Sequence, residues 1–182
     1  YKPLNGLYSR SEISLSNLDN NLYSSKDKSD DYGLGWKQQL VIEKQLNPAG
    51  LTWKNEFSIE KISQNFSIIE PFRNPEFNRD WSLPSNSSSS GKSLLWALQS
   101  GLHQDHFVAN YKLQRYTQSS FYQGMIHGWN LAFDHAGTTV KASGSAMFNS
   151  SMISTGSLIR PKMELRQSII KKGHHTAGIS LD

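Results

Sequence analysis

The sequence predicts an all-β fold, an antiparallel meander of about eight or nine strands. Apolar and polar residues alternate with period two along most of the chain, as they do where successive side chains point to opposite faces of a strand. Short turn-forming segments separate these stretches, and no stretch has a convincing helical period. Because short turns cannot join parallel strands, we expect sequential neighbours to pair antiparallel, with little helix.

The composition fits one β-rich domain. The 182 residues are 36% hydrophobic, below the roughly 45–50% of an average globular domain, and Ser, Asn, Gln and Thr make up much of the difference. Such residues suit a sheet whose second face meets water, a lumen or a ligand. Aromatic residues recur along the whole length, which argues against disorder. We expect residues 1–182 to form a single antiparallel β region, truncated at both ends.

Charge and cysteine content exclude several classes of function. The net charge of +4 arises from signs that are mixed through most strands, which indicates surface charge and no nucleic-acid partner. The chain has no cysteine, so disulfides, thiolate zinc sites and cysteine catalysis are excluded. It also has no run of roughly 20 apolar residues that would predict a helical membrane span.

The clearest strand is expected at Gly33 to Leu46. Its even positions Leu34, Leu40 and Ile42 are apolar, whereas Lys37, Gln39 and Glu43 point the other way. A slip of one residue would exchange the whole set, so this pattern fixes the two faces of the strand. The other elements of the first half are a strand at Leu7–Leu15, a polar loop at Ser16–Tyr32, a turn at Asn47–Gly50, a strand at Leu51–Ile59, and a β-bulge or strand break at Glu60–Ile62, where the apolar phase slips.

The second half is expected to consist of three hairpins after a flexible Ser-rich loop at residues 85–91. The predicted hairpins are Leu94–Leu102 with Phe107–Thr117, Phe121–Phe133 with Thr138–Phe148, and Leu158–Ile170 with Thr176–Leu181, with turns in His103–His106, Asp134–Gly137 and Lys171–Gly173.

Strands of this length match an outer-membrane-type β-barrel, in which a tilted strand crosses the hydrocarbon layer in roughly 9–11 residues. Trp36, Trp53, Trp96 and Trp129 fall within strands and suit interfacial aromatic girdles. Three polar residues on otherwise apolar faces argue against a barrel: Gln38, Lys44 and His127. A lipid-facing Lys near mid-bilayer would cost roughly 2–4 kcal/mol. A soluble β-sandwich that binds glycan or protein through exposed aromatics therefore stays open as the alternative.

The densest motif is Glu70–Trp81. It supplies the candidate binding residues Phe72, Arg73, Phe77, Arg79 and Trp81. As a functional site, these residues would form a platform for carbohydrate or peptide. As structure, the motif would be an ordered loop with its path fixed by prolines and held closed by ion pairs of its arginines with Glu70, Glu76 and Asp80.

A family resemblance rests on this motif together with Ser11–Asn17, Asn21–Ser24 and Asp30–Gly33. These stretches resemble segments of large envelope β-proteins of the Bacteroidetes type. The resemblance touches about the first half of the chain and supplies no catalytic residue. It implies an outer-membrane or cell-surface setting and a non-catalytic structural or translocating role. The expected partners are outer-membrane lipid and the remaining strands of the parent chain, together with envelope proteins or glycan.

Motifs for metal binding and catalysis are weak. Asp27–Asp31 alternates oxygen ligands, but an EF-hand needs Gly where Tyr32 stands. His103 with His106, and His174 with His175, offer two ligands at each place, whereas zinc needs three or four. Nucleophile-elbow and phosphate-loop patterns are missing. We therefore predict no catalytic residue, no metal site and no cofactor.

Overall fold

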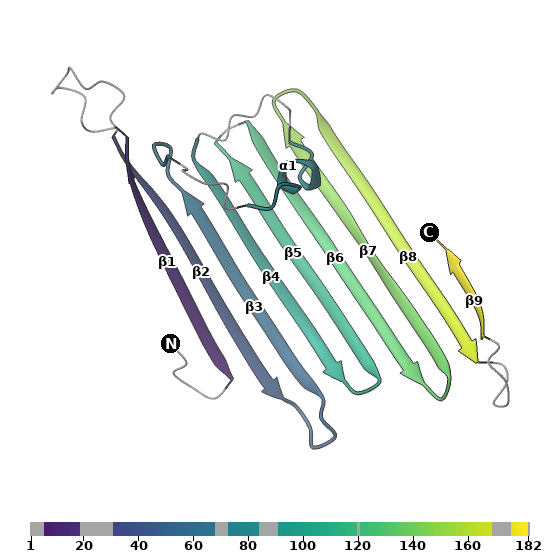
Figure 1. The fold of residues 1–182 in the computed structure, drawn as a ribbon. Coiled ribbons are helices and arrows are strands. Elements are labelled where there is room, and N and C mark those ends of the chain that lie inside the picture. Colours follow the sequence, from purple (N-terminus) through teal and green to yellow (C-terminus); the bar gives the residue numbers. More distant parts are fainter. Residues whose placement is uncertain are drawn as a thin grey trace.

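One antiparallel sheet forms almost the whole described structure. The computed structural model describes residues 6–18, 31–67, 73–83, 91–119, 121–168 and 176–181. Each strand pairs with the next along the chain in a nine-stranded sheet (Figure 1), which confirms the predicted antiparallel meander. The strands are β1 (Leu7–Asn17), β2 (Tyr32–Gln45), β3 (Thr52–Ile62), β4 (Ser93–Gln104), β5 (Phe107–Gln118), β6 (Tyr122–His135), β7 (Thr138–Ser151), β8 (Thr155–Ser168) and β9 (Thr176–Leu181).

The sheet is open in the described part of the chain. β1 lies at one edge and β9 at the other, and these two strands do not pair with each other (Figure 1). The one described helix is α1 (Phe77–Asp80), which lies between β3 and β4 in sequence. No helix within the described ranges is long and apolar enough to span a membrane.

Tight turns connect the strands at one end of the sheet, at the positions predicted. In the turn after β2, the Asn47 side-chain carbonyl accepts a hydrogen bond of 2.9 Å from the Leu51 amide. In the turn after β6, Ala136 and Gly137 have φ values of 51° and 82°, the left-handed pair that a two-residue hairpin turn requires. The predicted turn at Lys171–Gly173 lies outside the described residues, as does the Ser-rich loop except for Gly91.

Of the two alternatives predicted near Glu60–Ile62, a β-bulge or a strand break, the structure has the end of the strand and no bulge. β3 keeps an unbroken register with both neighbours up to Ile62, where the strand ends. The apolar residues shift from odd to even positions because Ile62 is buried on the opposite face of the sheet from Ile59. Its exposed fraction there is only 6%. The chain then leaves the sheet, and Phe66 lies over Gly35 of β2.

Unbroken registers divide the side chains of β1–β8 into two faces. The apolar face consists of the even positions of β2, β4 and β7 and the odd positions of β1, β3, β5, β6 and β8. The other positions form the polar face. Most of the large apolar side chains that remain exposed are on the apolar face: Ile13, Leu15, Tyr32, Leu34, Ile42, Trp53, Phe57, Leu98, Tyr111, Leu131, Phe133, Phe148, Ile159, Met163 and Leu165.

The buried core lies on the polar face, beneath α1. Its central cluster consists of Trp81, Tyr116 and Tyr122, which are 3%, 1% and 3% exposed. Tyr116 and Tyr122 occupy even positions of β5 and β6, and Phe77 of α1 packs against this cluster. The described second layer of the molecule therefore covers the polar face.

Candidate functional site

Arg73 links the segment that carries α1 to three strands of the sheet. Its Nη2 lies 2.6 Å from Oε1 of Glu60 on β3, and its Nε lies 3.1 Å from the same oxygen. Its Nη1 donates to the hydroxyl of Tyr116 on β5 at 3.1 Å, and Nη2 donates to that of Ser93 on β4 at 3.2 Å. The Arg73 and Glu60 side chains are 20% and 12% exposed, so this pair is largely shielded from water.

Aromatic rings surround the same guanidinium. Its central carbon lies 4.5 Å from the Phe77 ring centroid and 4.9 Å from that of Tyr116, within the range of cation–π attraction. The Phe77 and Tyr116 rings meet edge to face at 5.1 Å, and the Trp81 ring lies 5.5 Å from Tyr116. The hydroxyl of Tyr122 donates to the Trp81 carbonyl oxygen. Arg73, Phe77 and Trp81 thus form one anchored cluster.

Arg79, another candidate residue from the sequence, is not part of this cluster. Arg79 pairs with Glu76 at 2.5 Å and with Asp80 at 3.5 Å, and its side chain is 73% exposed. These two pairs match the ion pairs expected within the motif, whereas Arg73 binds Glu60, which the motif does not contain. Phe72 lies outside the described residues.

Glycines leave room for the second layer on the polar face. A Cβ atom at Gly33 would meet the backbone of Phe66, and one at Gly124 would lie 3.0 Å from the Trp81 ring and 2.6 Å from the Tyr122 hydroxyl oxygen. Nearby, the Ser16 hydroxyl accepts a hydrogen bond from the Ser67 amide at 2.9 Å. The sequence of the strands is therefore adapted to a covering segment on this face.

The apolar face has no such cover in the described part of the chain, and several of its polar groups bond to one another. The Gln38 amide nitrogen donates to the Ser9 hydroxyl at 2.9 Å, and Ser11 donates to the Gln38 carbonyl oxygen. His127 Nδ1 lies 2.6 Å from the Tyr111 hydroxyl oxygen. Of the three residues that argued against a barrel, Gln38 and His127 are thus paired. The third, Lys44, lies next to the last residue of β2, beside the tight turn.

The apolar side chains form a band that runs obliquely across the strands. On β2 the band extends from Leu34 to Ile42, and on β8 from Ile159 to Leu165. The midpoint of this stretch is Gln38 on β2 and Lys162 on β8. The strand pairing, followed from Lys162 across the sheet, leads to Glu43 on β2 and not to Gln38. The intermediate partners are Ser143, Asn130, Asn110, Gly101 and Lys54.

The two faces also differ in charge sign. Every carboxylate in the described strands is on the polar face: Glu12, Glu43, Glu56, Glu60, Asp134 and Glu164. The charged residues of the apolar face in these strands are all basic, namely Lys44, Lys61 and Arg115, and all three lie toward strand ends. The apolar face is therefore without negative charge.

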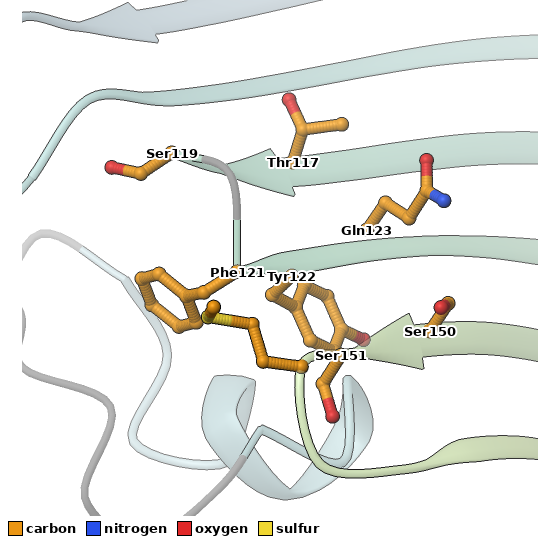
Figure 2. Close-up of a pocket in the computed structure, with 8 residues that line it drawn as sticks. Thr117, Ser119, Phe121, Tyr122, Gln123, Ser150 and Ser151 are labelled. Atoms are coloured by element: carbon orange, nitrogen blue, oxygen red, sulfur yellow. The ribbon is translucent and has the colours of Figure 1, made fainter.

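Two adjoining pockets lie at the ends of β5, β6 and β7. Figure 2 shows the larger, of about 310 Å³, with Phe121 and Tyr122 beside the short helix and the hydroxyls of Thr117 and Ser150 among its other linings. Its described lining consists of hydroxyl, amide, aromatic and Met side chains and contains no charged side chain. The smaller, of about 270 Å³, shares Gln123 and Ser150 with it and adds Arg115, Met125 and Phe148. These linings can form hydrogen bonds but contain no paired nucleophile and base.

The histidines do not converge on a metal site within the described ranges, where no group of three His, Asp or Glu side chains could hold an ion. His103 Nε2 lies 3.0 Å from the Asn110 side-chain oxygen, and the His106 and His135 rings lie 5.5 Å apart. His174, His175 and the Asp27–Asp30 part of the acidic turn lie outside the described residues.

Comparison with known protein families, with characterised proteins and with solved structures finds no match to this chain.

The sequence predicted Arg73, Phe77 and Trp81 as site residues but not Glu60, Ser93 and Tyr116, which hold them. A signal was present for Tyr116 but not for Glu60 or Ser93. Leu95, Tyr116, Tyr122 and Ile126 interrupt the polar face with apolar side chains, and such a cluster on a polar face marks a place where another segment packs.

Proposed function

We propose that the chain is a non-catalytic structural or translocating part of an outer-membrane-type β-barrel, with its apolar face against lipid and its polar face toward the interior. The observation that carries the proposal is the position of the second layer. In a soluble two-layer protein, the covering elements bury the apolar face of the sheet. Here the α1 segment packs on the polar face, and side chains such as Leu131 and Phe148 remain 47% and 48% exposed.

Strand length supports the same assignment. β4 and β5 each have 12 residues, which span about 40 Å at about 3.3 Å per residue. At a tilt of about 45°, such a strand rises about 28 Å, close to the hydrocarbon thickness of about 30 Å. The two longest connections, residues 18–31 and 63–92, leave the same end of the sheet, which also carries the short connections 119–121 and 152–154. Long loops gathered at one end fit an outer-membrane barrel.

Several polar groups of the apolar face are paired as lipid exposure requires, whereas the amide nitrogen of Asn55 on this face is buried without a hydrogen-bond partner among the described residues. In hydrocarbon, a polar group must find its partner within the protein, and Gln38 with Ser9, and Tyr111 with His127, form such pairs. Lys44, Lys61 and Arg115 lie toward strand ends, where long basic side chains reach the headgroups.

Edge strands supply the proposed protein partners. β1 and β9 each have one neighbour in the described sheet, so the backbone groups along their outer sides are free to pair with further strands. We propose that these are the remaining strands of a parent chain, which would close the sheet. The proposed location is the bacterial outer membrane or cell surface, where lipid, envelope proteins and glycan are accessible.

Tryptophan quenching tests the proposal. Trp36, Trp53, Trp96 and Trp129 are on the apolar face, whereas Trp81 is buried beneath α1. In vesicles of phosphatidylcholine with brominated acyl chains, we expect strong quenching, and the Trp81→Phe variant should lose almost none of it. Absence of quenching in the folded protein would refute the lipid-facing assignment.

A soluble module that binds glycan is the second candidate, and the larger pocket favours it. Uncharged hydroxyls, the Gln123 amide and aromatic rings line that pocket, and such groups suit a neutral sugar. The two candidates differ in solution. The barrel segment should aggregate in buffer and recover β-structure in detergent, because its apolar face and sheet edges are exposed. A monomer that melts cooperatively in plain buffer would support the soluble module.

A further inference from the structure

We propose that the apolar face binds a phosphate-bearing lipid headgroup at Arg115, at the end of the sheet where the turns 119–121 and 152–154 lie. This inference rests on the proposed function and names a lipid class for it. Among the described residues, Arg115 is the one charged side chain that lines the smaller pocket, with Met125 and Phe148 among its neighbours. An arginine guanidinium binds phosphate with paired hydrogen bonds.

The position of Arg115 fits the boundary between acyl chains and headgroups. Its cross-strand partners on the same face are Trp96 and Met125, both of which belong to the apolar band. Toward the strand ends, the same face changes to Thr117, Gln123 and Ser150. These uncharged hydrogen-bonding groups suit the glycerol or sugar part of a headgroup, and the guanidinium lies between them and the band.

Charge complementarity selects an anionic lipid over a neutral one. Arg115 forms no ion pair with a described residue, because every carboxylate of the described strands is on the opposite face. Lys61 is on the same face toward the same end of the sheet, two strands away. Carboxylates would be repelled from an anionic membrane surface, whereas basic residues near it are attracted.

Brominated lipids of two kinds test the inference. In a variant with Trp36, Trp53 and Trp129 replaced by Phe, Trp96 remains next to Arg115, and Trp81 stays shielded beneath α1. In mixed vesicles, we expect brominated phosphatidylglycerol to associate near Trp96 about five times more strongly than brominated phosphatidylcholine, the factor typical of one basic residue at a membrane surface. Arg115→Gln should abolish this preference, and Arg115→Lys should keep most of it.

Lys112→Gln is the matched control, because Lys112 is an exposed cation on the same strand but on the polar face. It should keep the full preference. Equal quenching by the two lipids in the parent protein, a preference that survives Arg115→Gln, or one that Lys112→Gln also removes would overturn the headgroup site while leaving the lipid-facing assignment intact. Quenching by neither lipid would overturn both.

Discussion

At the scale of single residues, Arg73 connects parts of the chain that are distant in sequence. It bonds to Glu60 before the helix and to Ser93 and Tyr116 after it. The Glu60 carboxylate pairs with the charge of its guanidinium, and two aromatic rings flank the guanidinium and shield its carbon atom. The role that the structure supports for this residue is to hold the α1 segment against the sheet.

Replacing Arg73 should destabilise the protein. Arg73→Ala would leave the largely shielded Glu60 carboxylate without its partner, at an expected cost of about 1–3 kcal/mol in the free energy of unfolding. Arg79→Ala is the control in the same segment, because the pairs of Arg79 are exposed, and it should cost less than about 0.5 kcal/mol. Urea unfolding in detergent measures both values. Equal losses for the two variants would contradict the anchoring role.

Gly124 permits a second test of the cover on the polar face. A valine side chain there would collide with the Trp81 ring and the Tyr122 hydroxyl, and overpacking of this kind costs about 1–3 kcal/mol. We expect Gly124→Val to lower the unfolding free energy and to shift Trp81 emission to the red as α1 loosens. Gly128→Val, on the same strand and face, should do neither, since a Cβ at Gly128 has no neighbour closer than 3.9 Å.

The contacts of Arg73 could be predicted from the sequence only in part. Charge and aromatic density marked the Glu70–Trp81 motif, and the pairing of Arg79 with Glu76 follows from their spacing of three residues. Glu60 and Tyr116 could not be assigned as partners of Arg73, because the proximity of these two residues depends on how β3, β4 and β5 align. Alignment fixes which residues face each other across a sheet, and local patterns do not contain that information.

At the scale of elements, each strand separates two environments. β2 is paired along its length, with β1 on one side and β3 on the other. Leu34, Leu40 and Ile42 consequently share the apolar face, while Lys37, Gln39 and Glu43 share the polar face, as the alternation predicts. The strands were predictable because periodicity is a local property of the sequence.

Spin labels on β2 can test this separation. We expect a nitroxide at Leu40 in vesicles to be relaxed mainly by oxygen, which concentrates in the hydrocarbon. A nitroxide at Gln39 should respond mainly to a water-soluble nickel chelate, because adjacent residues of a strand face opposite sides. Similar accessibility of the two labels would exclude a strand with one face against lipid.

The β-bulge was predicted incorrectly because a second layer of the molecule covers part of the polar face. The apolar residues after Ile59 suggested an extra residue in β3, but the strand continues regularly, and Ile62 is buried on the polar face. Similarly, Tyr116 and Tyr122 are apolar exceptions on that face because α1 packs over them. Periodicity alone cannot distinguish a change of phase from a local cover, since both place an apolar residue on the unexpected face.

At the scale of the whole molecule, the lengths of the connections distinguish one end of the sheet from the other. The connections of residues 18–31 and 63–92 leave the same end of the sheet, and the tight turns at Asn47–Gly50 and Ala136–Gly137 lie at the other. Outer-membrane barrels keep short turns in the periplasm and place longer loops outside. Under the proposed function, α1 and the Arg73 cluster would therefore lie near the outer opening, and Arg115 would face the outer leaflet.

The oblique course of the apolar band implies how the strands would stand in a bilayer. Between β2 and β8, the centre of the band moves by about five residues, or about 17 Å, while the sheet advances about 29 Å at about 4.8 Å per strand. If the band lies parallel to the membrane plane, the strands lean from the membrane normal by about 30°, near the roughly 35–45° of known barrels. Polarised infrared spectra of oriented membranes should give this inclination. Strands perpendicular to the membrane would instead mean that the slope of the band has no relation to lipid.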